Sequence, residues 1–111
     1  MELNRKLPVY PDYRHCLVNL SNSILKKFGA ETTAETLPLA DRYLEKDHRN
    51  IVVLLLDAMG TSILEKHLDP NGFFRSHLVS SFDSVYPPTT VAATTSMLSG
   101  RYPSVTLAVL K

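Results

Sequence analysis

The sequence predicts an α/β fold in which a small sheet is covered by helices. One reason is a continuous apolar run at residues 51–56, a pattern typical of a parallel strand that is buried on both faces. A second is the run at residues 80–86, which favours another strand and is followed by a Pro-Pro pair that enforces an extended exit. Helical patterns lie before, between and after these two runs, an order typical of a βαβ-like arrangement.

Each expected helix has a local signal. The first begins near Asp12, because the apolar residues from Tyr13 to Phe28 recur at spacings of three and four, and Gly29 is placed to end it. Thr61 or Ser62 can cap a later helix. The expected helical ranges are 12–28, 39–46, 61–68, 73–78 and 90–98, the last of them rich in small residues and closed by Gly100.

Composition and charge limit the class of protein. The chain has 111 residues, which allows one domain at most, and its 44% hydrophobic and 21% charged residues are ordinary for a soluble protein. A net charge of +1 without long charged blocks gives no reason to expect a nucleic-acid polymer or a membrane surface as partner. No apolar run approaches the roughly 20 residues of a membrane span, and no secretory signal is visible. The sequence therefore predicts a soluble, cytoplasmic polypeptide.

Three side chains are candidates for chemistry. Asp57 follows the first predicted strand, where an α/β sheet places its ligands, and a carboxylate there can hold a metal or act as a nucleophile. It can equally be a solvated loop acid. Thr89 and Thr90 open a predicted helix, where the helix dipole favours an anion, although a threonine at this position is most often a simple cap. The four histidines lack the spacing of metal ligands.

These motifs together resemble a known family. The segments 52–60, 86–90 and 96–103 are similar to the amino-terminal part of the type I phosphodiesterase/nucleotide pyrophosphatase family of the alkaline phosphatase superfamily. The similarity covers Asn50 to Pro103. It implies a partial alkaline-phosphatase-like sheet with flanking helices, the amino-terminal portion of a larger α/β/α domain.

The resemblance also divides the chain and assigns roles. It implies an N-terminal helical segment at 1–49 and the start of an incomplete catalytic domain at 50–111. Asp57 becomes a metal ligand, and Thr90 becomes both a metal ligand and the nucleophile, with Thr89 as the fallback nucleophile. The backbone N–H of Val91 is expected to bind the phosphate. The implied cofactors are two divalent metal ions, zinc in most of the family, and the implied substrate is a small-molecule phosphoester that forms a covalent phosphothreonine.

Three departures from the family pattern change this expectation. Ala58 replaces a glycine, and Ala93 stands where a phosphate-binding asparagine is common in the family. Residues 104–111 show no His-Gly pair after Pro103, and the family's remaining metal ligands lie beyond this point. The expectation is therefore a truncated metal-dependent phosphoester hydrolase that is inactive, or nearly so, on its own.

Other functions remain open on the sequence. In a haloacid-dehalogenase-type phosphatase Asp57 would be the nucleophile and Thr61 would match the loop, but Met59 occupies the place of the second acid. A non-catalytic module that binds phosphate or a partner protein needs only the turn before Val91. A non-functional remnant with exposed apolar surface is the third alternative. The sequence leaves open diester, pyrophosphate or monoester as substrate, the metal and the oligomeric state.

Overall fold

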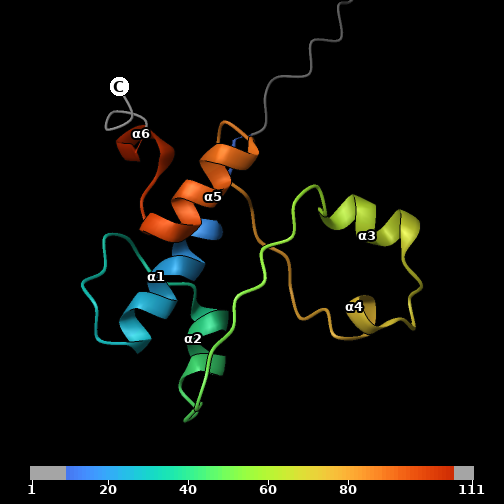
Figure 1. Ribbon diagram of the computed structural model, residues 1–111, viewed down its shortest axis with the longest axis horizontal. Helices are drawn as coiled ribbons and strands as arrows, with labels where there is room; N and C mark the ends of the chain where they lie inside the picture. The colour runs from blue at the N-terminus through green and yellow to red at the C-terminus, as the bar shows by residue number, and fades with distance from the viewer. Residues whose placement is uncertain (1–9, 107–111) are drawn as a thin grey trace, which may run out of the picture.

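The computed structural model describes residues 10–106, and within this range it contains six helices and no strand (Figure 1). No helix of this range is both long and apolar enough to cross a bilayer. The helices are α1 (Leu17–Lys27), α2 (Pro38–Leu44), α3 (Thr61–His67), α4 (Phe73–Ser76), α5 (Thr90–Ser99) and α6 (Pro103–Thr106). The first five correspond to the predicted helices, with α1 starting later than expected. The helix α6 was not predicted.

The core lies where α1 packs against α5 on one side and against α2 on the other. Its buried apolar residues are Cys16, Val18, Val85 and Ala92. Small side chains on α5 let the two helices approach closely, and the hydroxyl of Ser21 donates a hydrogen bond across the interface to the Met97 carbonyl at 2.7 Å. The core therefore joins a helix from the start of the chain to one from its end.

The buried face of α1 is more polar than its apolar spacing predicts. Phe28, expected to point inward, is 68% exposed. Four polar residues of α1 are buried instead: Asn19, Ser21, Asn22 and Ser23. Each forms a hydrogen bond, as buried polar groups must to avoid a desolvation penalty. Periodicity missed this face because it counts apolar residues only.

Asn22 connects three segments. Its amide nitrogen donates to the carbonyls of Val18 and Gly100, both at 2.9 Å. Its amide oxygen accepts from the backbone N–H groups of Thr33 at 2.8 Å and Ala34 at 3.2 Å. One fully buried side chain therefore ties the polar loop after α1 and the end of α5 to the middle of α1.

We expect Asn22→Ala to lower the free energy of unfolding by about 2 kcal/mol, because several buried polar groups lose their partner at once. The loss is limited because Thr33 is exposed and water can reach its backbone. Asn71→Ala is the matched control, since Asn71 is an exposed residue of a turn outside the core. Urea denaturation measures both, and equal stability of the two variants would contradict the role given to Asn22.

The α/β prediction is wrong for the described residues. The run 51–56 crosses the molecule as an extended segment with no strand partner (Figure 1). Its side chains are exposed rather than buried, Val52 to 88% and Leu54 to 72%. A parallel strand needs neighbours on both edges and helices on both faces. Helix α1 packs against α2 and α5 instead, so the run has no sheet to join.

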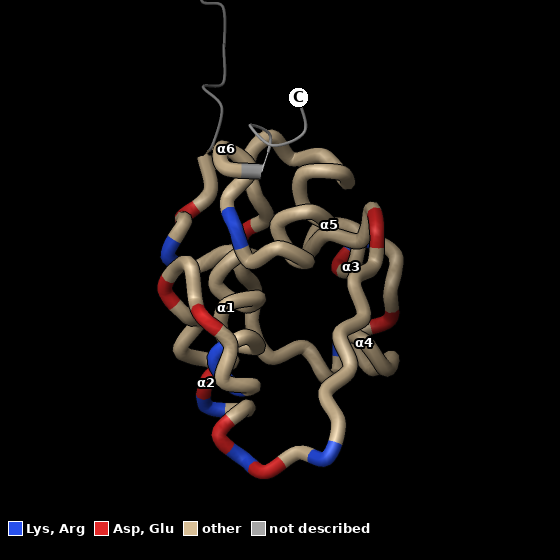
Figure 2. Tube along the Cα trace, turned by 60° about the vertical axis from the view of Figure 1, so that its left-hand side comes forward, with Lys and Arg blue, Asp and Glu red and all other residues tan. Residues whose placement is uncertain are grey.

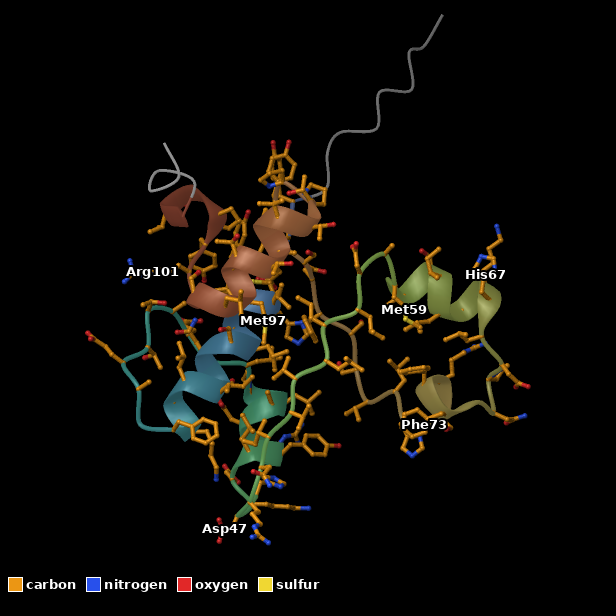
Figure 3. All side chains as sticks on the ribbon, viewed as in Figure 1. Asp47, Met59, His67, Phe73, Met97 and Arg101 are labelled. Atoms are coloured by element: carbon orange, nitrogen blue, oxygen red, sulfur yellow. The ribbon has the colours of Figure 1, made fainter. Side chains whose placement is uncertain are left out.

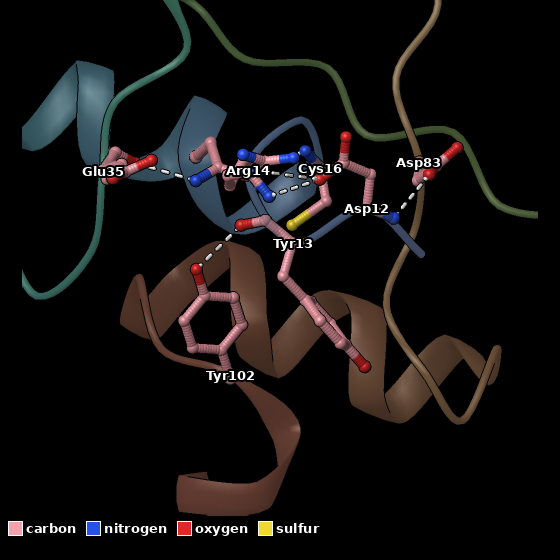
Figure 4. A network of polar contacts seen from close by, with 8 residues as sticks. Asp12, Tyr13, Arg14, Cys16, Glu35, Asp83 and Tyr102 are labelled. Atoms are coloured by element: carbon pink, nitrogen blue, oxygen red, sulfur yellow. Dashed lines mark hydrogen bonds and ion pairs between the residues drawn. The ribbon is translucent and has the colours of Figure 1, made fainter. Parts of the chain in front are cut away.

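The second predicted strand, 80–86, forms a single bridge rather than a ladder. Asp83 pairs in parallel with Cys16: its N–H donates to the His15 carbonyl at 3.0 Å and its carbonyl accepts from the Leu17 N–H at 2.9 Å. Figure 4 shows this region, where Tyr102 donates from its phenol to the Tyr13 carbonyl at 2.9 Å. Cys16 is fully buried, and burial raises the pKa of its thiol. The bridge anchors the start of α1, but it makes no sheet.

Residues 57–82, here called the α3–α4 arm, stand apart from the other helices (Figure 1). Among the described helices, α3 and α4 contact only each other. Apolar side chains of the arm, together with Leu56, surround a shallow depression of about 260 Å³; they include Met59, Leu64, Phe74 and Leu78. The arm therefore has a small apolar cluster of its own, separate from the core.

Candidate functional site

The N-terminus of α5 presents two threonines with different roles. Thr89 is the N-cap, and its hydroxyl oxygen accepts the N–H of Ala92 at 3.2 Å. Thr90 is the first residue of the helix, and its hydroxyl does not cap the helix but contacts Asp57. The hydroxyl oxygen of Thr89 is therefore occupied by an ordinary capping hydrogen bond. Thr90 is thereby left as the hydroxyl that can serve another purpose.

The hydroxyl of Thr90 donates a hydrogen bond to a carboxylate oxygen of Asp57, with Oγ1 and Oδ1 3.0 Å apart. The two residues are separated by 33 positions in the chain. Asp57 follows the exposed run, and Thr90 opens α5, so this contact joins the α3–α4 arm to the core. A carboxylate at this distance orients a hydroxyl and can accept its proton. The structure therefore brings together the two residues that the resemblance marks for catalysis.

A depression of about 640 Å³ surrounds this pair. Its wall includes the turn from Asp57 to Gly60, residues 82–84, and residues 88–90, 93 and 94 of α5 and its approach. The backbone N–H groups of Thr90 and Val91 point out of the first turn of the helix and have no acceptor within residues 10–106. Free amides at a helix N-terminus favour an anion. The depression is thus lined by a hydroxyl, a carboxylate and the residue that carries one unpaired donor, Thr90, while the second donor belongs to the next residue, Val91, outside the lining.

Asp83 also lines this depression, although sequence reasoning assigned it no role. Its carboxylate accepts the backbone N–H of Asp12, with Oδ2 2.8 Å from the nitrogen (Figure 4). That bond holds the carboxylate toward the start of α1. Asp83 was embedded in a predicted strand, where no spacing signal distinguishes it. We assign it a structural role at the edge of the depression.

The two-zinc arrangement implied by the resemblance does not fit the described residues. A zinc ion takes three or four protein ligands, and no three side chains of His, Cys, Asp or Glu gather into such a group within residues 10–106. Figure 3 shows His67 on the outer end of α3, on the far side from α5. Asp57 and Thr90 supply only two of the side chains that such a site needs.

Ala58, which follows Asp57, has a left-handed backbone conformation with φ at +53°. This conformation strains a residue that carries a Cβ and suits glycine. The turn that presents Asp57 to Thr90 holds this strain in the present chain.

We expect Ala58→Gly to stabilise the folded protein by about 0.5 kcal/mol, because relief of the left-handed strain exceeds the added entropy of the unfolded chain. The control is Ala40→Gly within α2, where the same exchange should destabilise by about 1 kcal/mol. Thermal unfolding should show a higher melting temperature than the wild type for Ala58→Gly and a lower one for Ala40→Gly. A stability loss of the same size at both positions would show that the turn at Ala58 is not strained.

Comparison of the chain with protein-family models, with curated proteins and with solved structures finds no match. The roles of Asp57, Thr90 and Val91 consequently rest on the geometry described above and on the motif resemblance.

Proposed function

We propose that this chain carries the nucleophile half of a phosphoester hydrolase site, with Thr90 as the nucleophile. The observation that supports the proposal is the 3.0 Å hydrogen bond from the Thr90 hydroxyl to Asp57, at the N-terminus of a helix with free backbone donors. Each feature alone is common in proteins. Their coincidence at one depression is what attack on a phosphorus atom requires: an oriented hydroxyl, a proton acceptor and donors for the phosphoryl oxygens.

The chemistry follows from these groups. Oγ1 of Thr90 attacks phosphorus, and its proton passes to the Asp57 carboxylate as the bond from phosphorus to the leaving oxygen breaks. The leaving oxygen takes a proton from water. A water molecule then cleaves the phosphothreonine, which restores the hydroxyl and releases phosphate, while Asp57 returns its proton to solvent. The free N–H of Val91 donates to a phosphoryl oxygen throughout.

Charge limits the rate of this step in the chain alone. The Asp57 carboxylate is within hydrogen-bonding distance of the nucleophile, so it repels an anionic phosphate that approaches Thr90. A divalent cation offsets such repulsion. We therefore expect the rate to rise when Zn²⁺ or Mg²⁺ is supplied, and to be lowest in a chelator.

The direct test is to look for the covalent intermediate. The purified chain is incubated with bis-(p-nitrophenyl) phosphate or p-nitrophenyl phosphate, with Zn²⁺, with Mg²⁺ or with EDTA, and is then quenched in acid. Peptide mass spectrometry should find the phosphoryl adduct on Thr90. Thr61 is the internal control, because it too is an exposed threonine at the first position of a helix. Equal labelling of both threonines, or labelling of neither in every condition, would refute the proposal.

A second candidate, a non-catalytic phosphate-binding module, is favoured by the incomplete set of metal ligands in residues 10–106. It needs only the free donors at the N-terminus of α5. Titration of the chain with inorganic phosphate in EDTA, followed by ³¹P NMR, distinguishes the two functions. Saturable binding without turnover of either ester favours the module, whereas turnover with Thr90 labelling favours the hydrolase.

A further inference from the structure

The run 51–56 is an exposed apolar surface on an extended segment. All six of its residues are aliphatic: Ile51, Val52, Val53, Leu54, Leu55 and Leu56. From Val52 to Leu56 the side chains are between 42% and 88% exposed. Such a continuous aliphatic surface is far more than the scattered apolar residues found on most soluble proteins. Only contact with another molecule or another part of the chain can remove this aliphatic surface from water.

The backbone of the run is as unpaired as its side chains. No N–H or C=O group between residues 51 and 56 forms a hydrogen bond within residues 10–106. An extended segment with free backbone groups is a template for strand pairing. The segment also contains none of the features that prevent such pairing, since it lacks proline, glycine and charge.

The charges that flank the run point to a second copy as its partner. Arg49 precedes the run and Asp57 follows it, and no charged residue lies between them. Figure 2 shows charged residues gathered over α2 and the loop after it, and a long uncharged stretch beyond that loop. In an antiparallel pair of two copies, Arg49 of each lies near Asp57 of the other. A parallel pair in register would set like charges side by side at both ends, which is unfavourable.

We propose that the run 51–56 mediates self-association of this chain as an antiparallel strand pair between two copies. The register that aligns both flanking charges places Val53 of one copy opposite Val53 of the other, and Leu54 opposite Val52. The pair satisfies backbone groups that are free in the monomer and covers aliphatic side chains on both copies. This interface does not use the Thr90 hydroxyl, although it places Arg49 of the second copy near Asp57, the proton acceptor of the proposed hydrolase site.

Sedimentation velocity over a wide range of protein concentration tests the association. The wild-type chain should shift reversibly from monomer to dimer as its concentration rises. Leu54→Lys should raise the dimer dissociation constant by about tenfold or more, because a charge in the middle of an edge strand opposes pairing. Leu98→Lys is the matched control: Leu98 is 83% exposed on α5 and is not part of the run, so its replacement should leave the dimer unchanged.

Two further measurements distinguish a specific loss of dimerisation from misfolding and from loss of the proposed hydrolase function. Far-UV circular dichroism should show the same helix content in both lysine variants, since no described hydrogen bond connects the run to a helix. Thr90→Ala should dimerise like the wild type, so that failure of the hydrolase proposal and failure of this one are separate. A chain that is monomeric at every concentration, or one whose association is weakened equally by both lysines, would overturn the proposal.

Cross-linking tests the orientation. In the antiparallel register, a mixture of Val52→Cys and Leu54→Cys chains should form the mixed disulfide, because opposite residues of a strand pair lie within the Cα separation that a disulfide spans. The natural Cys16 is buried and does not compete. Preferential disulfides between two Val52→Cys chains, or between two Leu54→Cys chains, would indicate a parallel pair in register and would overturn the proposed arrangement.

Discussion

Replacing Thr90 with alanine is expected to lower phosphoester turnover by about a thousandfold or more, because removal of a nucleophile leaves only binding and orientation to act on the substrate. This corresponds to roughly 4 kcal/mol on the activation barrier. The measurement is the rate of p-nitrophenol release from the phosphodiester in the divalent ion that supports the fastest wild-type rate. Thr90→Ser keeps a hydroxyl at the start of α5 and should retain most of the rate.

Two companion variants separate chemistry from folding. Thr61→Ala removes the hydroxyl at the equivalent position of α3 and should leave the rate unchanged. Asp57→Asn keeps the shape of the side chain but weakens proton acceptance, and we expect a loss of about a hundredfold. If Thr90→Ala retains the wild-type rate while Asp57→Asn abolishes it, then Asp57 is the nucleophile, as in the dehalogenase-type alternative. If all three variants react like the wild type, the measured turnover does not come from this site.

The second large effect concerns Gly100, the residue that ends α5. Its φ is +68°, and a Cβ added there would lie 2.9 Å from Cδ1 of Leu25. Gly100→Ala therefore combines left-handed strain of about 1 kcal/mol with a cost of about 1 kcal/mol for turning the end of the Leu25 side chain away from its preferred rotamer. The carbonyl of Gly100 also accepts hydrogen bonds from Asn22 and Thr33, so Leu25 and not Gly100 has to move. We expect a total loss of about 2 kcal/mol in the free energy of unfolding.

Two other glycines of the chain separate the cost of backbone strain from the cost of the Cβ contact. Gly29 has the same left-handed backbone, with φ at +72°, but open space where its Cβ would be. Gly29→Ala should therefore cost about 1 kcal/mol, the backbone share alone. Gly60 has neither positive φ nor a close neighbour, and Gly60→Ala should be nearly neutral. Urea unfolding of the three variants should rank them Gly100, Gly29, Gly60. A loss at Gly29 as large as that at Gly100 would show that the Leu25 contact carries no cost.

The helices could be predicted because their signals are local. The small-residue helix that became α5 has its cap at Thr89 and its end at Gly100 within one short segment. The strand at 51–56 was wrong because hydrophobicity reports a preference for burial, whereas a strand exists only if other segments pair with it. The only bridge within residues 10–106 joins Cys16 and Asp83, two positions that no sequence pattern connects.

At the candidate site, too, local motifs could be recognised in the sequence, whereas contacts between distant segments could not. Asp57 and Thr90 lie in the first two of the three segments that carry the resemblance, and a hydrogen bond joins their side chains. Their roles in catalysis stay predictions. The buried contacts of Asn22 were not foreseen, because a polar residue in a helix gives no sequence signal for burial. Periodicity therefore located the helices, but it could not locate the polar contacts that join them.

The separation of the α3–α4 arm from the other helices has a consequence for any reaction at Thr90. Asp57 lies where the arm leaves the core, and among the described helices α3 and α4 touch only each other. The arm can open as an independent cooperative unit while α1, α2 and α5 stay folded, as weakly attached segments of proteins commonly do. Each opening parts the carboxylate from the hydroxyl. The fraction of molecules competent to react is then set by this local equilibrium and not by the global stability of the helical core.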